Sequence, residues 1–263
     1  MIVITTPSGQ IGHQVLDNLL ASGEHLRVIV RDASALGAGA RELVEIIEGS
    51  HSDAAIVNRA FVGADAVFWL MPPNPHAPSV EIAYVDFTRP AAEAFRKHRV
   101  GRVVGISALG RGTPYASRAG FVTGSLAMDD LIASTGVAYR ALTNPSFMDN
   151  IARQVPSIAS QSMFFSPIDG DRKLPSVATR DIASAASRLL LDNKWNGFDE
   201  VPLLGPADIS FNEMAEIMSN VLGKEIRFQQ TTFEAYKERF IGFGMSEATR
   251  MKNGLPSVSA LIA

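Results

Sequence analysis

The stretch Met1–Arg31, MIVITTPSGQIGHQVLDNLLASGEHLRVIVR, decides the fold of this chain. Its first apolar run, Ile2–Ile4, does not alternate with polar residues, which is typical of a parallel strand buried on both faces. A turn with Gly9 and Gly12 follows, and then one helical face carries Ile11, Val15, Leu16, Leu19 and Leu20. Leu26–Val30 forms the second strand. This order predicts the first βαβ unit of a dinucleotide-binding fold.

The glycine turn predicts a phosphate site, because a phosphate must approach the backbone at a helix N-terminus, where free N–H groups attract anions. In a G-x-x-G-x-x-G spacing, Thr6 takes the first glycine position and Pro7 follows it. Proline favours an extended residue before it, so we expect Thr6 not to be left-handed and the loop to differ from the glycine version. The hydroxyls of Thr6 and Ser8 either contact phosphate or satisfy the loop. The cofactor contacts expected here are Thr6, Ser8, Gly9, Gln10, Ile11 and Gly12. The alternative is a plain glycine turn of an α/β protein.

Arg31 directly follows the second strand and bears on the choice of cofactor. A carboxylate at this place would hold the ribose diol of NAD, whereas an arginine suits the 2′-phosphate of NADP. We therefore predict NADP(H) as the cofactor, preferred over NAD(H). The alternative is a solvated pair between Arg31 and its neighbour Asp32 at a strand end.

The composition narrows the class of protein and of partner. The chain has 263 residues, 46% of them hydrophobic, which is enough for a large α/β domain with a small lobe. A net charge of -3 without a basic run gives no reason to expect nucleic acid or an anionic membrane. The lack of cysteine excludes disulfides and thiolate chemistry, and the histidine spacing predicts no metal. A strand starting at the first residues and the lack of a long apolar run predict a cytoplasmic protein.

Strands and helices are expected to alternate up to Asn150. Further strands are predicted over Leu43–Ile47, Ala64–Leu70, Arg102–Ile106 and Val137–Leu142, and helices over Asp53–Phe61, Val80–Arg99 and Phe121–Ser134, with Pro90 kinking or splitting the second. The predicted fold class is α/β, a Rossmann-type doubly wound parallel sheet with a smaller C-terminal lobe. We expect an NAD(P)-binding domain over 1–150 and a lobe that lines the substrate cleft over 151–263.

Apolar faces and caps predict the helices of the C-terminal segment. Thr179–Leu191 carries one apolar face. Ser210–Glu213 is a capping box for a helix that ends at Gly223, and Thr231–Glu234 is a second box for a helix over 233–240. The final Pro256–Ala263 shows no clear pattern.

In an open parallel sheet, ligands bind beyond the carboxyl ends of the strands. Leu70, Met71, Pro72 and Pro73 stand at the end of one predicted strand, and Ser107 stands at the end of the next. The two prolines either form a rigid wall of the cleft or only end the strand. The Ser107 hydroxyl either faces the nicotinamide or caps a turn.

The sequence lacks the Tyr-x-x-x-Lys pair that supplies a proton in ordinary short-chain dehydrogenases. The residues four positions after the tyrosines are Thr88, Ala119, Thr143 and Phe240. We therefore leave the catalytic residue unassigned and expect quinones or cationic dyes as acceptors, because these take hydride with little need for a protein acid.

A flat acceptor requires apolar walls, and the chain offers Phe147, Met148, Met163, Phe164 and Phe165, which alternatively belong to the core. His76, in the loop after the fourth strand, either donates a proton or is only solvated. The substrate contacts that we predict are Phe147, Met148, Phe164 and His76.

Several segments, in this order and spacing, resemble the NmrA-like family of atypical short-chain dehydrogenases. They are TPSGQIG, RVIVRD, GADAVFWLMPP, GRVVGISA, STGVAYRALTNPSFMDN, SVATRDIASAASRLLLD and LLGPADISFNEMAEIMSNVLGKEI. The family includes NADPH quinone reductases, triphenylmethane dye reductases and redox-sensing regulators. The resemblance implies that the first domain binds NAD(P)H, with Pro145 among the contacts, and that the C-terminal lobe closes a cleft over the nicotinamide.

The chain also departs from the family pattern. Thr6 replaces the first glycine, and Thr143, Asn144 and Pro145 stand before Ser146–Asn150 where strand six of the family usually ends R-P-G-x-F-M-E-N. Ser125 stands where a lysine or histidine tends to reach the nicotinamide ribose. We predict an enzyme, an NAD(P)H-dependent oxidoreductase that transfers hydride to a quinone-like or other conjugated acceptor. The alternative is a non-catalytic NAD(P)-binding redox sensor. The expected partner is a small molecule, and whether the chain forms a homodimer stays open.

Overall fold

A computed structural model describes residues 1–72, 74 and 76–236, which are built around one sheet of seven strands. In spatial order the strands are β3 (Glu45–Glu48), β2 (Leu26–Val30), β1 (Ile2–Thr5), β4 (Ala66–Trp69), β5 (Arg102–Ala108), β6 (Ala138–Asn144) and β10 (Phe198–Pro202). Every neighbouring pair runs parallel. The chain order reverses between β1 and β4, so ligands are expected at the carboxyl ends of these two strands.

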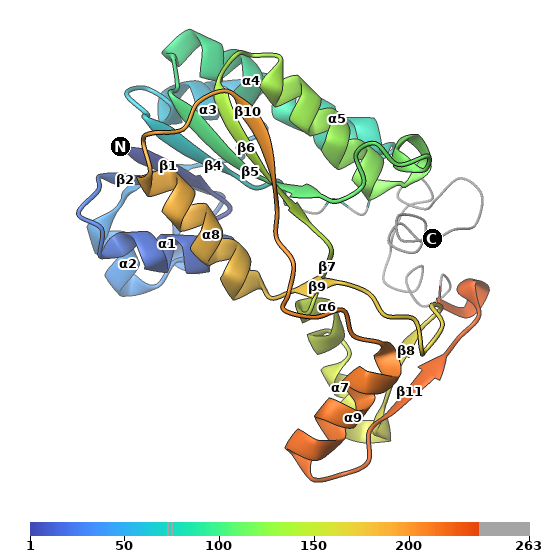
Figure 1. The fold of residues 1–263 in the computed structure, drawn as a ribbon. Coiled ribbons are helices and arrows are strands. Elements are labelled where there is room, and N and C mark those ends of the chain that lie inside the picture. The colour runs from blue at the N-terminus through green and yellow to red at the C-terminus, as the bar shows by residue number, and fades with distance from the viewer. Residues whose placement is uncertain (73, 75, 237–263) are drawn as a thin grey trace.

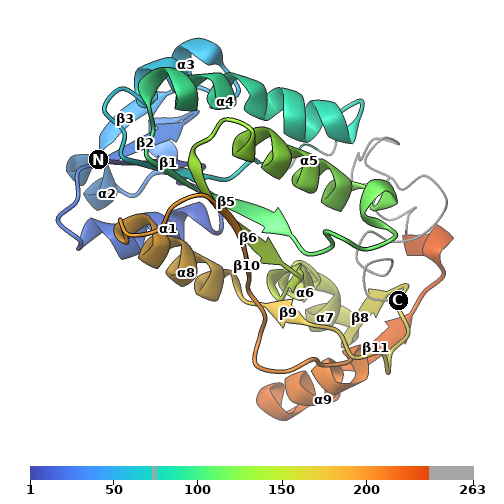
Figure 2. The same ribbon diagram turned by 45° about the horizontal axis from the view of Figure 1, so that its top comes forward.

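Helices cover both faces of the sheet (Figures 1 and 2). One face packs against α1 (Gly12–Leu20), α2 (Ala38–Leu43) and α8 (Thr179–Leu191), and the other against α3 (Ala54–Ala60), α4 (Phe87–His98) and α5 (Phe121–Ala133). Strand residues alternate between the two cores: Ile4 and Phe68 pack on the α1 side, while Val3 and Val67 pack on the α5 side. The predicted Rossmann-type doubly wound sheet is confirmed.

A smaller lobe lies beyond the carboxyl ends of β5 and β6 (Figure 1). It consists of α6 (Asp149–Ala152), α7 (Val155–Gln161), β8 (Met163–Ser166), α9 (Phe211–Leu222) and β11 (Arg227–Gln230), and β8 pairs with β11. A short pair, β7 (Ser146–Phe147) and β9 (Ser176–Val177), joins the lobe to the sheet. The lobe has its own apolar core around Ile158, Phe164, Ala215 and Ile226.

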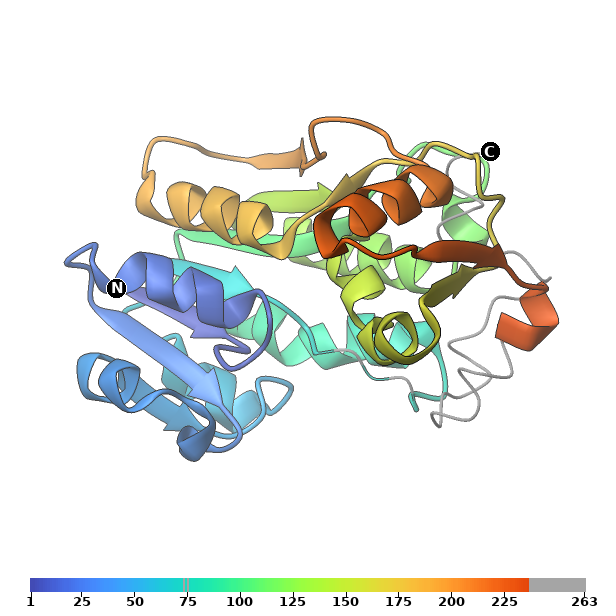
Figure 3. The ribbon, with the colours of Figure 1, turned by 90° about the horizontal axis from the view of Figure 1, so that it is seen from below.

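The segment after residue 150 is shared between the lobe and the main sheet. α8 lies beside α1, which Figure 3 shows from below, and Ile182 joins the α1 core. β10 extends the sheet by pairing with β6, from Phe198 opposite Tyr139 to Pro202 opposite Thr143. The chain therefore visits the lobe twice and returns to the sheet in between, so the lobe is held at both ends.

Local differences from the expected elements have simple causes. Pro90 lies inside α4 and does not end the helix. The preceding turn, Ile82–Asp86, is π-helical and accommodates the proline. Proline has no N–H to donate to the carbonyl of Asp86, so the ladder widens there. Leu43 ends α2, and the third strand starts only at Glu45.

The first predicted capping box is confirmed. The Glu213 N–H donates to Ser210 Oγ at 3.1 Å, the Ser210 N–H donates to the Glu213 carboxylate at 2.7 Å, and Gly223 ends α9 with a φ of 64°. For the second box the cap is Thr232, not Thr231, because the Ala235 N–H donates to Thr232 Oγ1 at 3.1 Å. The rest of that predicted helix, the tail Pro256–Ala263 and Pro73 lie outside the described residues.

No helix in the part of the chain that the structure describes is long and apolar enough to cross a membrane.

We expect Ile182→Ala to destabilise the whole sheet and not only the lobe. Ile182 is fully buried in the α1 core, so removing three carbons should lower the free energy of unfolding by about 2–5 kcal/mol. Leu191→Ala, at a side chain 45% exposed on the same helix, should cost less than about 1 kcal/mol. Urea unfolding measures both values, and equal costs would contradict the assignment of α8 to the main core.

Candidate functional site

The glycine turn folds more tightly than the sequence suggests. Thr6 is left-handed, with a φ of 54°, so the prediction that Pro7 keeps it extended is wrong. The Gly9 N–H donates to the Thr6 carbonyl at 3.0 Å, and Thr6 Oγ1 donates to the Leu70 carbonyl at 2.7 Å. These two bonds offset a local backbone cost of about 1–3 kcal/mol. Thr6 therefore performs the part of the missing first glycine.

The two remaining glycines let the turn close on itself. A Cβ added at Gly12 would lie 2.0 Å from the Thr6 carbonyl oxygen, and one at Gly9 would lie 2.9 Å from Thr6 Cγ2. The N-cap residue of α1, Ile11, offers no capping side chain, and in the described part of the chain the His13 N–H donates to the Gly9 carbonyl at 2.9 Å. A bare backbone at a helix N-terminus beside the switch point fits the pyrophosphate of a dinucleotide.

The Leu70 carbonyl joins the carboxyl ends of β1 and β4. It accepts hydrogen bonds from Thr6 Oγ1 at 2.7 Å, from Thr5 Oγ1 at 3.3 Å and from the His51 ring at 3.1 Å. Of the two roles predicted for the Thr6 hydroxyl, the structure shows the hydrogen bond inside the protein. Ser8 is exposed at the start of the turn. Leu70, Met71 and Pro72 are all half-buried at this edge.

His51 is a supporting residue that the sequence did not single out for this place. It is buried, and its ring packs edge-on against Trp69 at 5.1 Å and Phe87 at 4.9 Å. Burial, with a smaller contribution from the charge of Arg31, lowers the pKa of His51 to about 4, against the hydrogen bond to the Leu70 carbonyl, which raises it. The ring is therefore neutral at pH 7, and its Nε2–H donates to the Leu70 carbonyl. This hydrogen bond helps to hold the carboxyl end of β4 in place.

Arg31 is exposed at the carboxyl end of β2. Its neighbour Asp32 accepts a hydrogen bond from the Ser34 N–H at 2.8 Å and caps a short turn. Among the described residues no ion pair joins Arg31 to Asp32, so the solvated pair held as an alternative does not form. An exposed guanidinium at this place can bind an anion beyond the second strand.

A buried polar network lies on the other side of the edge. Ser107, at the end of β5, donates a short hydrogen bond to Asp129 of α5, and Tyr139 of β6 donates to the same carboxylate at 2.6 Å. Ser125 Oγ lies 3.3 Å from Ser107 Oγ. Asp129 and Tyr139 are fully buried, and Ser107 is 5% exposed. The Ser107 hydroxyl therefore points toward α5, not into a turn.

Burial raises the pKa of Asp129 to about 7, against the hydrogen bonds from Ser107 and Tyr139, which lower it. Its nearest cation is Arg111, at 4.0 Å. That guanidinium is engaged by Asp130 at 2.8 Å and by a short bond to Glu200. Sequence reasoning missed Asp129, although its spacing of four from Ser125 places both on one face of α5.

Asn144 and Pro145 end β6 at the same edge. The Asn144 amide donates to the carbonyls of Leu142 at 2.7 Å and Ser107 at 3.1 Å. Its buried Oδ1 has no hydrogen-bond partner among the described residues. Pro145 is half-buried next to it. An unpaired acceptor here fits an amide donor such as the nicotinamide carboxamide.

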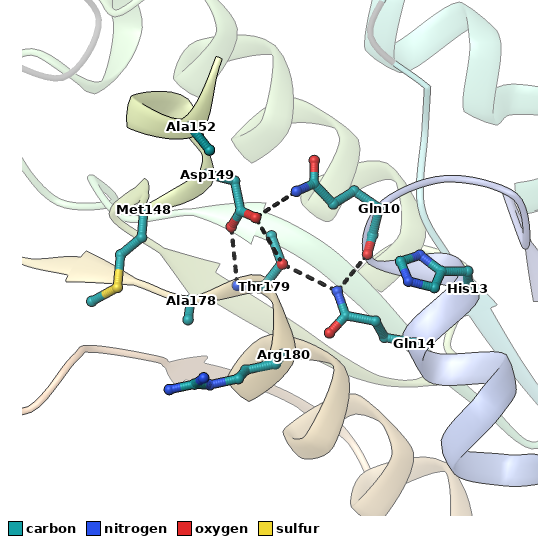
Figure 4. A pocket seen from close by; sticks show the side chains of 9 residues that line it. All are labelled: Gln10, His13, Gln14, Met148, Asp149, Ala152, Ala178, Thr179 and Arg180. Carbon is teal, nitrogen blue, oxygen red and sulfur yellow. Dashed lines mark hydrogen bonds between the residues drawn. The ribbon is translucent and has the colours of Figure 1, made fainter. Parts of the chain in front are cut away.

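A cavity of about 460 Å³ separates the glycine turn from the lobe (Figure 4). Gln10 donates a short hydrogen bond to Asp149 at the start of α6, and Asp149 also accepts from the Thr179 hydroxyl at 3.2 Å. The Gln14 amide reaches Thr179 Oγ1 at 3.1 Å. Met148 supplies an apolar wall of this cavity. The Gln10 side chain therefore links the glycine turn to the lobe by a hydrogen bond.

The structure separates the predicted substrate contacts. Met148 is 38% exposed, Phe147 is half-buried against the main core, and His76 is exposed. Phe164 is fully buried, with Phe228 at 5.4 Å in the core of the lobe, so the prediction that it lines the cleft is wrong. The apolar run around Phe164 supplies the core of the lobe and not the wall of a cleft. No group of three or more metal-ligating side chains gathers in the described part of the chain.

Comparison with known proteins agrees with this geometry. A family model described as NAD(P)H-binding matches residues 8–193. An NAD(P)H azoreductase of Xenophilus azovorans is 25% identical over 94% of this chain and 83% of its own length.

Two solved structures share the fold. The Citrobacter sp. triphenylmethane reductase complexed with NADP(H) has a TM-score of 0.78 and 20% identity, covering 94% of this chain and 84% of that one. The Escherichia coli NADPH-dependent quinone oxidoreductase QOR2 complexed with NADPH has a TM-score of 0.79 and 20% identity, covering 100% of this chain and 89% of that one.

The buried carboxyl of Asp129 predicts a pH-dependent stability. Between the ordinary pKa of 3.8 and about 7, the folded protein keeps a proton that the unfolded chain has lost. The Asp129 contribution to the free energy of unfolding should therefore fall as pH rises through this window, by about 4 kcal/mol at most, and level off above it. Neutral His51, whose pKa is lowered to about 4, contributes a slope of opposite sign between that pH and its ordinary pKa of 6.5. Asp129→Asn should therefore make the pH slope measured by urea unfolding more positive than in the unaltered chain. Asp130→Asn, at the exposed neighbour, should leave the slope as in the unaltered chain, and an unchanged slope in Asp129→Asn would refute the assignment.

Proposed function

The chain belongs to the family of NAD(P)H-binding proteins, and from this we propose that it is an oxidoreductase that reduces a conjugated small molecule with NADPH. The observation that carries the proposal is the edge between β1 and β4. Along the carboxyl edge around this point lie the N-terminus of α1 after β1, an exposed arginine after β2 and an unpaired amide acceptor at the end of β6, each suited to a different part of the cofactor. Bound NADPH would supply the hydride.

The chain's own residues would hold and orient that cofactor. The turn would offer the backbone N–H groups of Gln10, Ile11 and Gly12 to the pyrophosphate, since the Gly9 N–H already donates to Thr6, and Arg31 would offer a charge-assisted fork to the 2′-phosphate. Met71, Pro72, Ser107 and Pro145 would line the nicotinamide side, where Asn144 Oδ1 accepts from the carboxamide. Thr6 and Gln10 would act through the backbone, since their polar side chains are engaged inside the protein. Leu70 would contact the cofactor with its apolar side chain, since its N–H and carbonyl are both engaged.

A conjugated acceptor is favoured because the site holds no activated tyrosine. Burial raises the pKa of Tyr84 to about 12, and burial together with Asp129 raises that of Tyr139 well above its ordinary value. Carbonyl reduction with a tyrosine acid needs the opposite shift. Quinones, azo compounds and cationic dyes delocalise the added electrons, and the names of the azoreductase, quinone and triphenylmethane relatives support such acceptors.

We place the acceptor against Phe147, Met148 and His76, which lead from the carboxyl edge toward the lobe. Met148 is the exposed apolar member, and a thioether adapts to flat ring systems. The second candidate function, a non-catalytic NADP sensor, is favoured by one feature. Ser125 replaces a basic residue near the ribose and is itself bonded within the network of Ser107.

Arg31→Ala should weaken NADPH binding by about 1–3 kcal/mol and leave NADH binding almost unchanged, because only the 2′-phosphate contact is lost. Arg188→Ala, at an exposed arginine at the far end of α8, serves as the control and should affect neither cofactor. Calorimetric titration measures all four affinities. An equal loss for NADPH and NADH would sink the phosphate assignment.

Steady NADPH oxidation is expected with a soluble benzoquinone, an azo dye or a cationic triarylmethane dye. The measurement is the loss of NADPH absorbance with each acceptor, against a control without protein. Binding of NADPH with no turnover of any of the three would favour the sensor instead.

A further inference from the structure

The network around Asp129 forms a continuous polar path from the interior to the carboxyl edge of the sheet. Ser125 and Asp129 lie one turn apart on α5, and both side chains face Ser107 at the end of β5. The path thus runs from a fully buried carboxyl to a hydroxyl at the edge where the nicotinamide is expected. Ser107 is its outer member and Asp129 its inner end.

The charges around the path make Asp129 the group that keeps a proton. Arg111 faces three carboxylates: it bonds Asp130 and Glu200 directly, while Asp129 lies 4.0 Å away. Tyr139 contributes a neutral hydroxyl from β6. One cation cannot neutralise three carboxylates, and the buried one pays the highest desolvation cost for its charge.

The hydroxyls of the path can reverse their direction. Ionised Asp129 accepts from both Ser107 and Tyr139. When Asp129 is protonated, it donates to Ser107 Oγ instead, and the Ser107 hydrogen turns outward, because a hydroxyl both donates and accepts. Between Ser107 and Ser125 either oxygen can be the donor. A proton on Asp129 therefore reaches the edge in two short transfers.

We propose that Asp129, acting through the Ser107 hydroxyl, is the proton reserve for acceptors that take up a proton as well as a hydride. Although hydride transfer to a quinone needs no tyrosine acid, a proton supplied at the site speeds the step, as general acid catalysis does. This inference rests on the proposed reductase function. A neutral quinone that accepts hydride from NADPH becomes a hydroquinone monoanion and leaves NADP⁺. Ser107 gives its proton to the anionic oxygen, and Asp129 gives its own to Ser107. After the product leaves, a proton from the bulk solvent returns to Asp129 through the Ser107 hydroxyl. Ser107 is then the catalytic residue, and Asp129 is a positioning residue that holds the proton.

Acceptor chemistry supplies an internal control. A cationic triarylmethane dye becomes neutral when it accepts hydride and takes up no proton, so its reduction does not need the path. The test compares kcat for a benzoquinone and for such a dye, with NADPH, in the full chain and in Asp129→Asn and Ser107→Ala. Both variants should lower kcat for the quinone by about 100-fold, the lower end of general acid catalysis, and change kcat for the dye less than about twofold.

The pH profile is a second readout that a structural role would not move. In the unaltered chain, kcat for the quinone should fall above about pH 7, where Asp129 loses its proton, while kcat for the dye stays level. Tyr139→Phe keeps the ring but removes one hydrogen bond that favours ionised Asp129, so it should move the falling limb to higher pH. Ser134→Ala, at an exposed serine at the end of α5, is the matched control and should leave both rates unchanged.

Each outcome decides between the alternatives. Equal losses with quinone and dye would show that the network only supports the fold and would overturn the relay. Unchanged quinone reduction in Ser107→Ala would overturn it as well. If the unaltered chain reduces neither acceptor, the proposed function fails and the relay fails with it. Selective loss of quinone reduction together with the shifted profile of Tyr139→Phe would support the relay.

Discussion

The carbonyl of Leu70 is the interaction on which the ligand-binding edge depends. It draws together the ends of β1 and β4 by accepting from Thr5, Thr6 and His51. The bond from Thr6 holds that residue in a left-handed conformation that a threonine before proline does not favour alone. Because Thr6 is left-handed, its carbonyl lies so close to position 12 that any residue larger than glycine would clash with it. α1 can therefore start directly after the turn. The bare helix N-terminus, the central feature of the proposed cofactor site, is therefore a consequence of long-range hydrogen bonds.

The same edge carries opposite electrostatics on its two sides. On the β2 side, Arg31 is exposed, and the neutral ring of His51 is buried nearby. On the β5 side, the Asp129 carboxyl of α5 is buried and accepts hydrogen bonds from the hydroxyls of Ser107 and Tyr139. A cation near solvent suits an anionic ligand, while a buried acid suits storage of a proton, because burial opposes its charge. The arrangement matches what the two ends of an NADPH-dependent reduction require.

The lobe and the turn form one mechanical unit. Asp149 at the start of α6 accepts from Gln10 in the turn and from Thr179 at the start of α8. Since α8 packs beside α1 and β10 pairs with β6, the chain leaves and re-enters the main sheet around the lobe. A displacement of the lobe would therefore break or strain the hydrogen bonds that join Asp149 to the glycine turn and to α8. This connection gives the cavity of Figure 4 walls from both parts of the protein.

The sequence by itself determined the local elements and the parallel architecture. Buried strands read as apolar runs, α8 follows its 3.6-residue period to the exact bounds predicted, and Ser210 caps α9 with Glu213. It also placed Gly9, Gly12 and Arg31 at the correct ends of their strands and helix, because these depend only on neighbours along the chain. Tertiary structure decided what depends on distant partners. Leu70 turned Thr6 against its local preference, and Phe228 enclosed Phe164 in the lobe. Burial raised the pKa of an ordinary helical aspartate, Asp129, against the hydrogen bonds from Ser107 and Tyr139 that lower it. Burial and hydrogen bonding between remote residues set such states, and no pattern within a short window encodes them.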